Sequence, residues 1–456
     1  MRKALHVIVQ GKDIPPPVTR FTDFKLPRVL LKHFEKKGIV IPSAIQAQGL
    51  PVALSGRDLV GIAYTGSGKT LVFALPALMW SLQEEARCPL RPGEGPIAVI
   101  MAPSRELARQ TADQCREFAE VCAQDPKYPA VRVMCCIGGE PIRAQMEVLA
   151  QGCHIVVATP GRLLDHLDKY RMNLSLCKYI ALDEGDHMLD ARGFEEELTS
   201  IQAYATRQRQ TLLFSATMPE KVQAFARSSL LDPIVVNVNR AGAASLDIAQ
   251  HVQYVQDDSK MVALLPTLQK TAPPVIIFAE NKRDVDDINE YLLLKGVAAT
   301  SIHGDKSQPE RAAAIDAFRA GDKDVLIATD VAAKGLDFPS IQHVINYDMP
   351  TEMETYIHRI GRTGRSGKTG TATTFVNARV PESSMLELKH LLMEAKQVIP
   401  PVLAAIDDPD EAAFLAGVDK RMTCPYCSGF HRLSDCPRAK RDAAAFMNRG
   451  QDGLTE

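Results

Sequence analysis

Residues 59–70 read LVGIAYTGSGKT. The first four are apolar, as in a buried strand, and the stretch LVFALPALMW that follows Thr70 is typical of a buried helix. Gly66 and Gly68 allow backbone N–H groups to converge on phosphate oxygens. Lys69 can reach the terminal phosphates, and the Thr70 hydroxyl can ligate Mg²⁺. The pattern favours a phosphate-binding loop, and the alternative is a flexible Gly-Ser turn before a helix.

Short apolar runs rich in β-branched residues alternate with helical segments through most of the chain. Runs that are apolar on both faces and separated by helices indicate a parallel sheet covered on both sides. The fold class is therefore α/β, with two large domains. Strands are expected at 97–100, 131–134, 155–158, 179–182 and 211–214 in the first domain and at 275–278, 325–328 and 343–346 in the second.

Composition limits the kinds of partner. The 456 residues include 53 Lys and Arg against 55 Asp and Glu, so any nucleic-acid site must be local. Ten cysteines without a secretory signal predict reduced thiols in the cytosol or nucleus. No stretch approaches the roughly 18 apolar residues of a membrane span, so we expect a soluble intracellular protein.

Turn-rich and charged stretches divide the chain. The segment NVNRAGAASLD interrupts the strand–helix pattern, and an acidic run follows Pro400-Pro401. We expect a short arm, a first domain, a linker, a second domain, an acidic linker, a cysteine module and a polar tail, with bounds 1–20, 21–235, 236–248, 249–402, 403–423, 424–437 and 438–456.

An acidic run follows the expected strand at 179–182 and reads DEGD from Asp183 to Asp186. Acids at the carboxyl end of a parallel strand lie on the ligand-binding edge of a sheet. Asp183 is suited to hold Mg²⁺, and Glu184 is suited to orient and polarise an attacking water. The alternative is a solvated acidic turn, which is the weaker interpretation beside a phosphate-binding loop.

These residues resemble the DEAD-box RNA helicases of helicase superfamily 2, from about Phe21 to about Phe375. The resemblance implies two RecA-like domains joined by a flexible linker. It rests on motifs in the family's order, namely GIVIPSAIQ ending at Gln46, AYTGSGKT, PSRELA at 103–108, Gly138-Gly139, TPGR at 159–162, DEGD, Ser215-Ala216-Thr217, VIIFAE at 275–280, IHGDKSQPER at 302–311, ATDVAAKGLD at 328–337 and HRIGRTGR at 358–365.

The resemblance also assigns roles to residues. It implies ATP and Mg²⁺ binding by Phe21, Gln46, Thr65, Gly66, Ser67, Gly68, Lys69, Thr70 and Asp337, with Mg²⁺ at Thr70 and Asp183. It implies catalysis by Lys69, Asp183, Glu184 and two arginine fingers, Arg362 and Arg365, and coupling between nucleotide state and domain closure through Asp186, Ser215, Thr217 and His358. RNA backbone contacts are implied for Arg105, Gly139, Thr159, Gly161, Arg162, Arg311, Thr329 and Gly335.

Two departures from the family's motifs stand out. Gly185 replaces the usual Ala of the DEAD motif, and we expect activity to persist with a looser turn. Lys334 stands where Arg is usual, which keeps the charge but loses the bidentate geometry.

The stretches IPPPVTRF, RAGAASLD and ATDVAAKGLDFPSIQHVINYDMP resemble the Abstrakt-type branch, which suggests nuclear work in pre-mRNA splicing.

A cysteine module lies near the C-terminus. Cys424, Cys427, His431 and Cys436 have near-ligand spacing for tetrahedral Zn²⁺. The module resembles a retroviral-type zinc knuckle with three residues before the His where four are usual. The alternative is a degenerate knuckle, or surface thiols that bind no metal.

The leading hypothesis is an RNA-dependent ATPase that unwinds short duplexes or remodels RNA–protein complexes. Because the fingers and the phosphate loop lie on different domains, ATP and RNA should both favour domain closure. The expected partners are RNA, bound without sequence preference, and possible spliceosomal or other ribonucleoprotein components, with the chain itself monomeric. One alternative is an ATP-gated RNA clamp with slow turnover. Another is an ATPase that acts on protein or DNA, which GIVIPSAIQ and PSRELA argue against.

Overall fold

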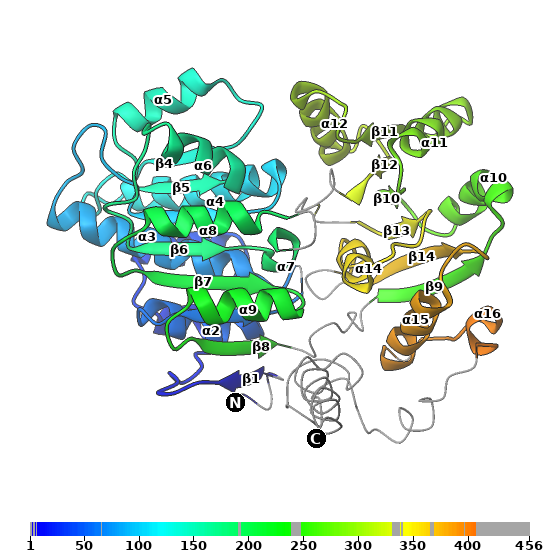
Figure 1. The fold of residues 1–456 in the computed structure, drawn as a ribbon, viewed down its shortest axis with the longest axis horizontal. Coiled ribbons are helices and arrows are strands. Elements are labelled where there is room, and N and C mark those ends of the chain that lie inside the picture. Colours follow the sequence, from blue (N-terminus) through cyan, green and yellow to red (C-terminus); the bar gives the residue numbers. More distant parts are fainter. Residues whose placement is uncertain are drawn as a thin grey trace, which may run out of the picture.

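The computed structural model describes residues 2, 5, 7–64, 66–189, 193–238, 248–330, 338, 341–364, 369–395 and 397–406. They form two α/β domains that lie side by side (Figure 1). The first domain contains β1 (Val7–Gln10), the 3₁₀ helix η1 (Phe21–Asp23), α1 (Arg28–Lys36), α2 (Ala44–Leu54), β2 (Leu59–Ile62), α3 (Lys69–Arg87), β3 (Ala98–Met101), α4 (Arg105–Ala123), β4 (Val133–Cys136), α5 (Ile142–Ala150), β5 (Ile155–Ala158), α6 (Pro160–Asp168), β6 (Tyr179–Leu182), α7 (Gly185–Met188), α8 (Glu195–Tyr204), β7 (Gln210–Ser215), α9 (Glu220–Ser229) and β8 (Ile234–Val238).

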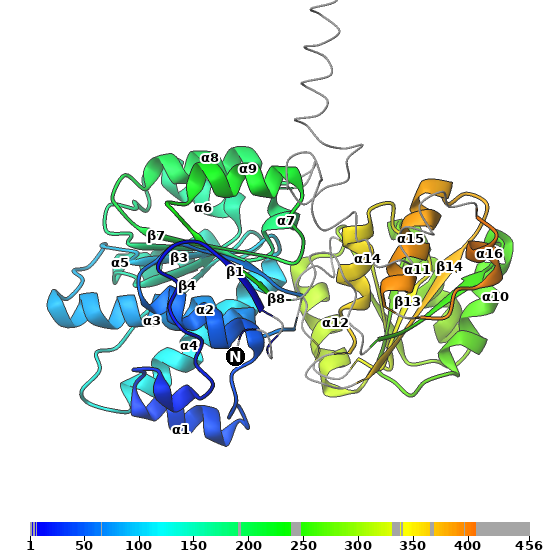
Figure 2. The ribbon, with the colours of Figure 1, turned by 90° about the horizontal axis from the view of Figure 1, so that it is seen from below.

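The described strands of the first domain form one sheet in the order β1-β8-β2-β7-β6-β3-β5-β4. Every neighbouring pair is parallel except β1 and β8, which are antiparallel. Successive residues of β2 point to opposite faces, so Leu59 enters the core on the α1–α4 side and Val60 enters the core on the α6, α8 and α9 side. Figure 2 shows these two helix layers covering the sheet, which accounts for strands that are apolar on both faces.

The second domain repeats this plan. It contains β9 (Ile248–Tyr254), α10 (Asp257–Leu268), β10 (Val275–Phe278), α11 (Lys282–Leu294), β11 (Ala299–Ile302), α12 (Gln308–Ala320), β12 (Val325–Ala328), β13 (His343–Asn346), α14 (Met353–Ile360), β14 (Gly370–Val376), α15 (Glu382–Glu394) and α16 (Pro401–Ala404). Its described strands form a parallel sheet in the order β11-β12-β10-β13-β14-β9. The expected α/β class with two parallel sheets is confirmed.

The expected strands agree with the structure except in detail. The strand expected at 131–134 is instead β4, Val133–Cys136, because Arg132 donates its backbone N–H to His154 Nδ1 at 3.0 Å while the two cysteine side chains enter the core. The segment expected as an arm at 1–20 supplies β1, so in the structure it is part of the first sheet. The expected linker at 236–248 begins inside β8 and ends at the first residue of β9. Within the described segments, we find no helix whose length and apolar character would suit a membrane span.

Candidate nucleotide and RNA site

The phosphate-binding loop lies between β2 and α3. Gly66 and Gly68 have φ of 84° and 90°, a left-handed conformation that a residue with a Cβ adopts only with strain. A Cβ on Gly68 would also lie 2.4 Å from Gln46 Nε2. Lys69 begins α3, is 6% exposed, and donates its ammonium group to the Ala63 carbonyl at 2.9 Å. The loop conformation therefore requires glycine at these positions and holds the lysine inside the loop.

The beginning of α2 is tied to this loop. Gln46 Nε2 donates to the Gly68 carbonyl at 3.0 Å, and Ser43 Oγ donates to the Ser67 carbonyl at 2.6 Å. Gln46 Oε1 also accepts the Ser43 N–H at 2.9 Å, which closes a capping box. Each end of the Gln46 amide keeps capacity for a second hydrogen bond, so adenine recognition stays a prediction. Phe21, the other residue expected at the adenine, is 4% exposed.

Two carboxylates follow β6 and are almost fully buried. Burial raises the pKa of Asp183 to about 6, against the opposing effect of Lys69. Burial would also raise the pKa of Glu184, but His187 and Arg362 hold it below its ordinary value. Glu184 has φ 54° and ψ 54°, a left-handed conformation that is uncommon outside glycine and is typical of strained functional sites. Asp183 and Glu184 thus lie in different electrostatic environments although they are adjacent.

These residues fit ATP and Mg²⁺. Ser67 Oγ and Glu184 Oε2 are buried, and neither has a hydrogen-bond partner in the part of the chain that the structure describes. Both belong to the loop-and-carboxylate constellation, whose glycine backbone suits phosphate oxygens and whose Thr70 and Asp183 oxygens suit a hard cation. Bound Mg²⁺ would neutralise charge on the phosphates.

The four residues expected to couple nucleotide state to closure lie together. Asp186 Oδ2 accepts hydrogen bonds from the Ala216 N–H at 3.1 Å and from the Thr217 N–H and hydroxyl, both at 2.9 Å. The Asp186 N–H donates to Ser215 Oγ at 3.2 Å. From the second domain, His358 Nε2 lies 3.3 Å from Asp186 Oδ2. One buried carboxylate therefore links the end of β7 to the other domain.

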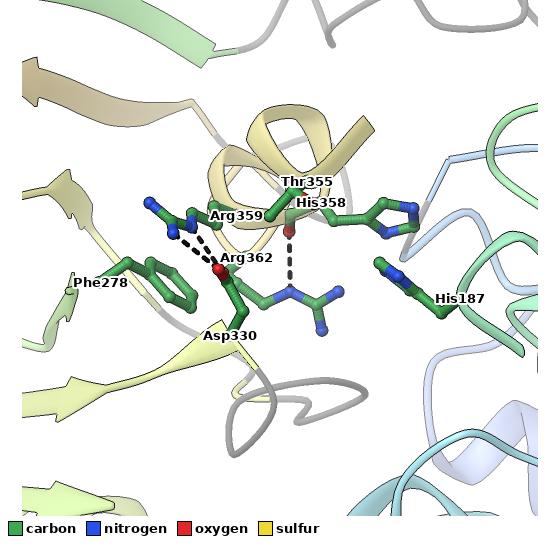
Figure 3. A pocket seen from close by; sticks show the side chains of 7 residues that line it. All are labelled: His187, Phe278, Asp330, Thr355, His358, Arg359 and Arg362. Carbon is green, nitrogen blue, oxygen red and sulfur yellow. Dashed lines mark hydrogen bonds and ion pairs between the residues drawn. The ribbon is translucent and has the colours of Figure 1, made fainter. Parts of the chain in front are cut away.

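The second domain presents α14 and the residues after it to this edge (Figure 3). Arg362 is 5% exposed, and its Nη2 lies 3.8 Å from Glu184 Oε1. Its Nε donates to the His358 carbonyl at 3.0 Å, which fixes the direction of the side chain. Behind it, Arg359 makes a bidentate contact with Asp330 at 2.6 and 2.7 Å. The domains meet with cations of the second against carboxylates of the first.

A groove of about 550 Å³ lies in the first domain, and its lining residue Arg105 contacts Gln308 of the second domain. Four of the residues expected to contact RNA line it, and Gly139 packs against the guanidinium of one of them. Its lining is Pro103, Arg105, Gly138, Ile142, Thr159, Gly161, Arg162, Asp165, Lys169 and Phe194. Arg162 Nη1 is buried without a hydrogen-bond partner among the described residues, which suits an incoming anion.

Two expected RNA contacts meet the opposite domain in this structure. Arg311 Nη2 lies 2.7 Å from Glu106 Oε1, with both side chains largely buried. Arg105 Nη1 donates to Gln308 Oε1 at 3.5 Å, a long contact. The expected contact Thr329 lies at the end of β12, buried, with its N–H donating to the Ile302 carbonyl. RNA that binds Arg311 would therefore have to compete with Glu106.

Residues 43–225 match the family described as DEAD/DEAH box helicase, and residues 258–367 match the helicase conserved C-terminal domain. DEAD-box ATP-dependent RNA helicase 35 of Arabidopsis thaliana is 57% identical over 455 residues, which cover 99% of this chain and 77% of that protein. The chain belongs to the DEAD-box RNA helicases. The Drosophila melanogaster helicase abstrakt is 51% identical over 439 residues, covering 96% of this chain and 70% of that protein.

A solved structure supports the helicase architecture. Saccharomyces cerevisiae Dbp5 bound to RNA and ADP BeF3 superposes with a TM-score of 0.72 at 28% identity, covering 88% of this chain and 99% of that one. The expected pair of RecA-like domains, the resemblance to the Abstrakt-type branch and the expectation of an ATP-dependent RNA helicase are thereby confirmed.

Some expected positions of this helicase lie outside the described residues. They are Thr65, Lys334, Gly335, Asp337, Arg365, Cys424, Cys427, His431 and Cys436. Within the described residues, no group of three or more His, Cys, Asp or Glu side chains is arranged to hold a metal ion. The zinc knuckle and the second arginine finger stay predictions.

Sequence reasoning missed several residues at the helicase interface. Glu106 lies inside PSRELA, but its partner is 205 positions away, so no local pattern shows the pair. His187 directly follows DEGD and lies against His358, which the linear sequence does not indicate. Lys169 was predictable, because it lies seven residues after Arg162 and so on the same side of α6 and the turn that follows it.

Proposed function

We propose that this helicase hydrolyses ATP at a site that is complete only when Arg362 of the second domain meets the loop and carboxylates of the first. The observation that carries the proposal is the 3.8 Å approach of Arg362 Nη2 to Glu184 Oε1, between two buried side chains. Arginine suits this position because its fixed fork matches phosphate oxygens. Arg365 would supply a second finger.

The remaining roles follow from this geometry. Lys69, Thr70 and Asp183 hold ATP and Mg²⁺ on the first domain, with Gln46 and Phe21 at the base and Asp337 at the ribose. Glu184 orients the attacking water, since its buried and ionised carboxylate has one oxygen without a hydrogen-bond partner among the described residues. One hydrogen-bonded cluster couples domain closure to the nucleotide site, and it consists of Asp186, Ser215, Thr217 and His358.

RNA would lie across both domains. The groove that contains Arg105 and Arg162 offers backbone, hydroxyl and guanidinium donors, which bind phosphates without reading sequence. The contacts in the second domain would come from Arg311, Thr329 and Gly335. Binding of one strand across both domains would favour closure and local strand separation.

The test compares ATP hydrolysis by the full chain with and without a single-stranded RNA. Hydrolysis should rise with RNA, and RNA affinity should rise with a slowly hydrolysed ATP analogue by the same factor as ATP affinity rises with RNA. If the folded protein hydrolyses ATP at the same rate with and without RNA, the proposal is contradicted. Tight RNA retention without turnover would instead indicate the clamp, which the relatives' names as ATP-dependent helicases do not favour.

We further propose a nuclear role in RNA–protein remodelling, including pre-mRNA splicing, on the strength of the resemblance to the Abstrakt-type branch. Ribonucleoprotein components would be its protein partners. Crosslinking of the chain to RNA in cells tests this, because recovery of spliceosomal RNA is expected and its absence contradicts the role.

We also propose that Cys424, Cys427, His431 and Cys436 bind one Zn²⁺, on the basis of their spacing. Elemental analysis of the full chain should find about one zinc per molecule. The Cys424→Ser and Cys427→Ser double variant should lose it. A zinc-free wild-type chain, purified without chelator, contradicts the assignment.

A further inference from the structure

His187 brings an aromatic ring to the domain interface. It lies in α7, directly after the DEGD carboxylates, and is 8% exposed. Its ring centroid is 4.1 Å from that of His358, with 49° between the ring planes. Figure 3 shows the two imidazoles facing each other across the space between the domains. A ring-to-ring contact of this kind exists only when the domains are closed.

His358 is the ring whose direction matters. Its Nε2 lies 3.3 Å from Asp186 Oδ2, at the long end of a hydrogen bond, so a small rotation of the imidazole would break the contact. Asp186 already accepts three hydrogen bonds from the end of β7 and is fixed in place. The direction of the histidine ring therefore decides whether this contact forms, because the terminal torsion of a histidine is broad unless packing restrains it.

We propose that His187 is a positioning residue for domain closure, which packs against His358 and holds that ring toward Asp186. This inference rests on the proposed function, in which Asp186 and His358 couple closure to the nucleotide site. The contact adds stability only to the closed form, so it lowers the amount of RNA needed to populate that form.

The surroundings of the pair favour a ring at position 187. The same small hollow is also lined by Arg362, Arg359 and Asp330. Arg359 and Asp330, at its far end, form a bidentate pair with each other. The side chain at 187 therefore shares this hollow with His358 and Arg362 and is almost fully buried, and a flat ring suits that position. A phenyl ring would preserve the packing against His358, whereas a methyl group would remove it.

The experiment measures RNA-stimulated ATP hydrolysis by the full chain carrying His187→Ala or His187→Phe. With Ala, the RNA concentration for half-maximal stimulation should rise about two- to tenfold, the range of an aromatic contact. With Phe, that RNA concentration should return most of the way to the wild-type value. Because the imidazole also helps to hold the pKa of Glu184 low, kcat at saturating RNA should fall to the same extent in both variants, so the RNA concentration is what distinguishes them. His251→Ala, on the exposed side of β9, is the matched control and should change neither quantity.

A second measurement separates this inference from the proposed function. Energy transfer between dyes on the two domains reports closure with an ATP analogue, independently of turnover. His187→Ala should lower the closed fraction and His187→Phe should restore it. An unchanged response to RNA with Ala, a loss confined to kcat, or a Phe variant no better than Ala would each overturn the inference. If RNA fails to stimulate the wild type, the proposed function fails, and the closure measurement still decides the role of His187.

Discussion

Replacement of Arg362 by Gln tests how the two domains build the hydrolytic site. The guanidinium is 5% exposed, is aimed by its Nε hydrogen bond to the His358 carbonyl, and has Nη2 3.8 Å from Glu184 Oε1. Glutamine keeps polarity and part of the length but loses the positive charge and the fork. The variant therefore removes the charge that the second domain brings to this point.

The size of the effect follows from the distance. Two unit charges 3.8 Å apart attract by about 4 kcal/mol at an effective dielectric constant of about 20. Salt screens this little, because both side chains are buried. We expect the same guanidinium to act on the phosphate charge in the transition state with similar strength. A loss of about 4 kcal/mol corresponds to a fall of about 10³-fold in kcat.

The assay is steady-state ATP hydrolysis at saturating RNA, combined with binding of a fluorescent ATP analogue in the absence of RNA. Arg362→Gln should lower kcat about 10³-fold and change analogue affinity less than about threefold, because the nucleotide is held mainly by the first domain. Arg379→Gln, whose side chain is 83% exposed in the same domain, is the control and should retain wild-type kcat. If Arg362→Gln keeps a third or more of the wild-type kcat, the finger is wrongly assigned.

Three further predictions concern stability. Gly185→Ala would place a Cβ 2.6 Å from Leu213 Cδ1, so we expect the free energy of unfolding, measured by thermal denaturation, to fall by about 1 kcal/mol. Adding Leu213→Val should recover this loss, and an unchanged melting temperature in Gly185→Ala argues against a tight fit. Arg359→Gln removes the bidentate partner of Asp330, which is 30% exposed, and should lower the free energy of unfolding in urea by about 2 kcal/mol, whereas a loss below about 0.5 kcal/mol would show that water replaces the contact. Burial lowers the pKa of His343 to about 4, below the ordinary 6.5, so as the pH falls the unfolded chain takes up a proton before the folded chain does. Between pH 7 and pH 5 the free energy of unfolding should fall about 2 kcal/mol more in wild type than in His343→Gln, and equal slopes would refute the shift.

The sequence was sufficient to predict the features that depend on residues close together in the chain. The loop at Gly66–Thr70 and the strand at 179–182 each depend on a pattern within a dozen residues, and both agree with the structure. The pairing of β1 with β8 was missed, because the two strands are more than 220 residues apart and only the second carries a helical neighbour to mark it. Local patterns identify elements, and they do not identify which distant element completes a sheet.

The same limit applies to the site. From the sequence, we expected Gly185 to loosen the turn. In the structure, Leu213 partly fills the space that a Cβ at this position would occupy, so the glycine permits close packing of α7 on β7. Glu106 was visible as a member of PSRELA, yet its contact with Arg311 required both domains to be placed. Residues that act between domains are specified by packing that no single motif contains.

The charges at the interface explain why closure and nucleotide binding should reinforce each other. Asp183, Glu184 and Asp186 are three buried carboxylates within four residues, an arrangement that is costly for the first domain alone. Arg362 brings positive charge to that edge and is among the causes that hold the pKa of Glu184 low against burial, and the contact with His358 helps to hold the pKa of Asp186 low. ATP would add phosphate charge at the same edge, which increases the electrostatic advantage of this guanidinium. The first domain therefore becomes more dependent on the second when it holds ATP, and the sign of the coupling is positive.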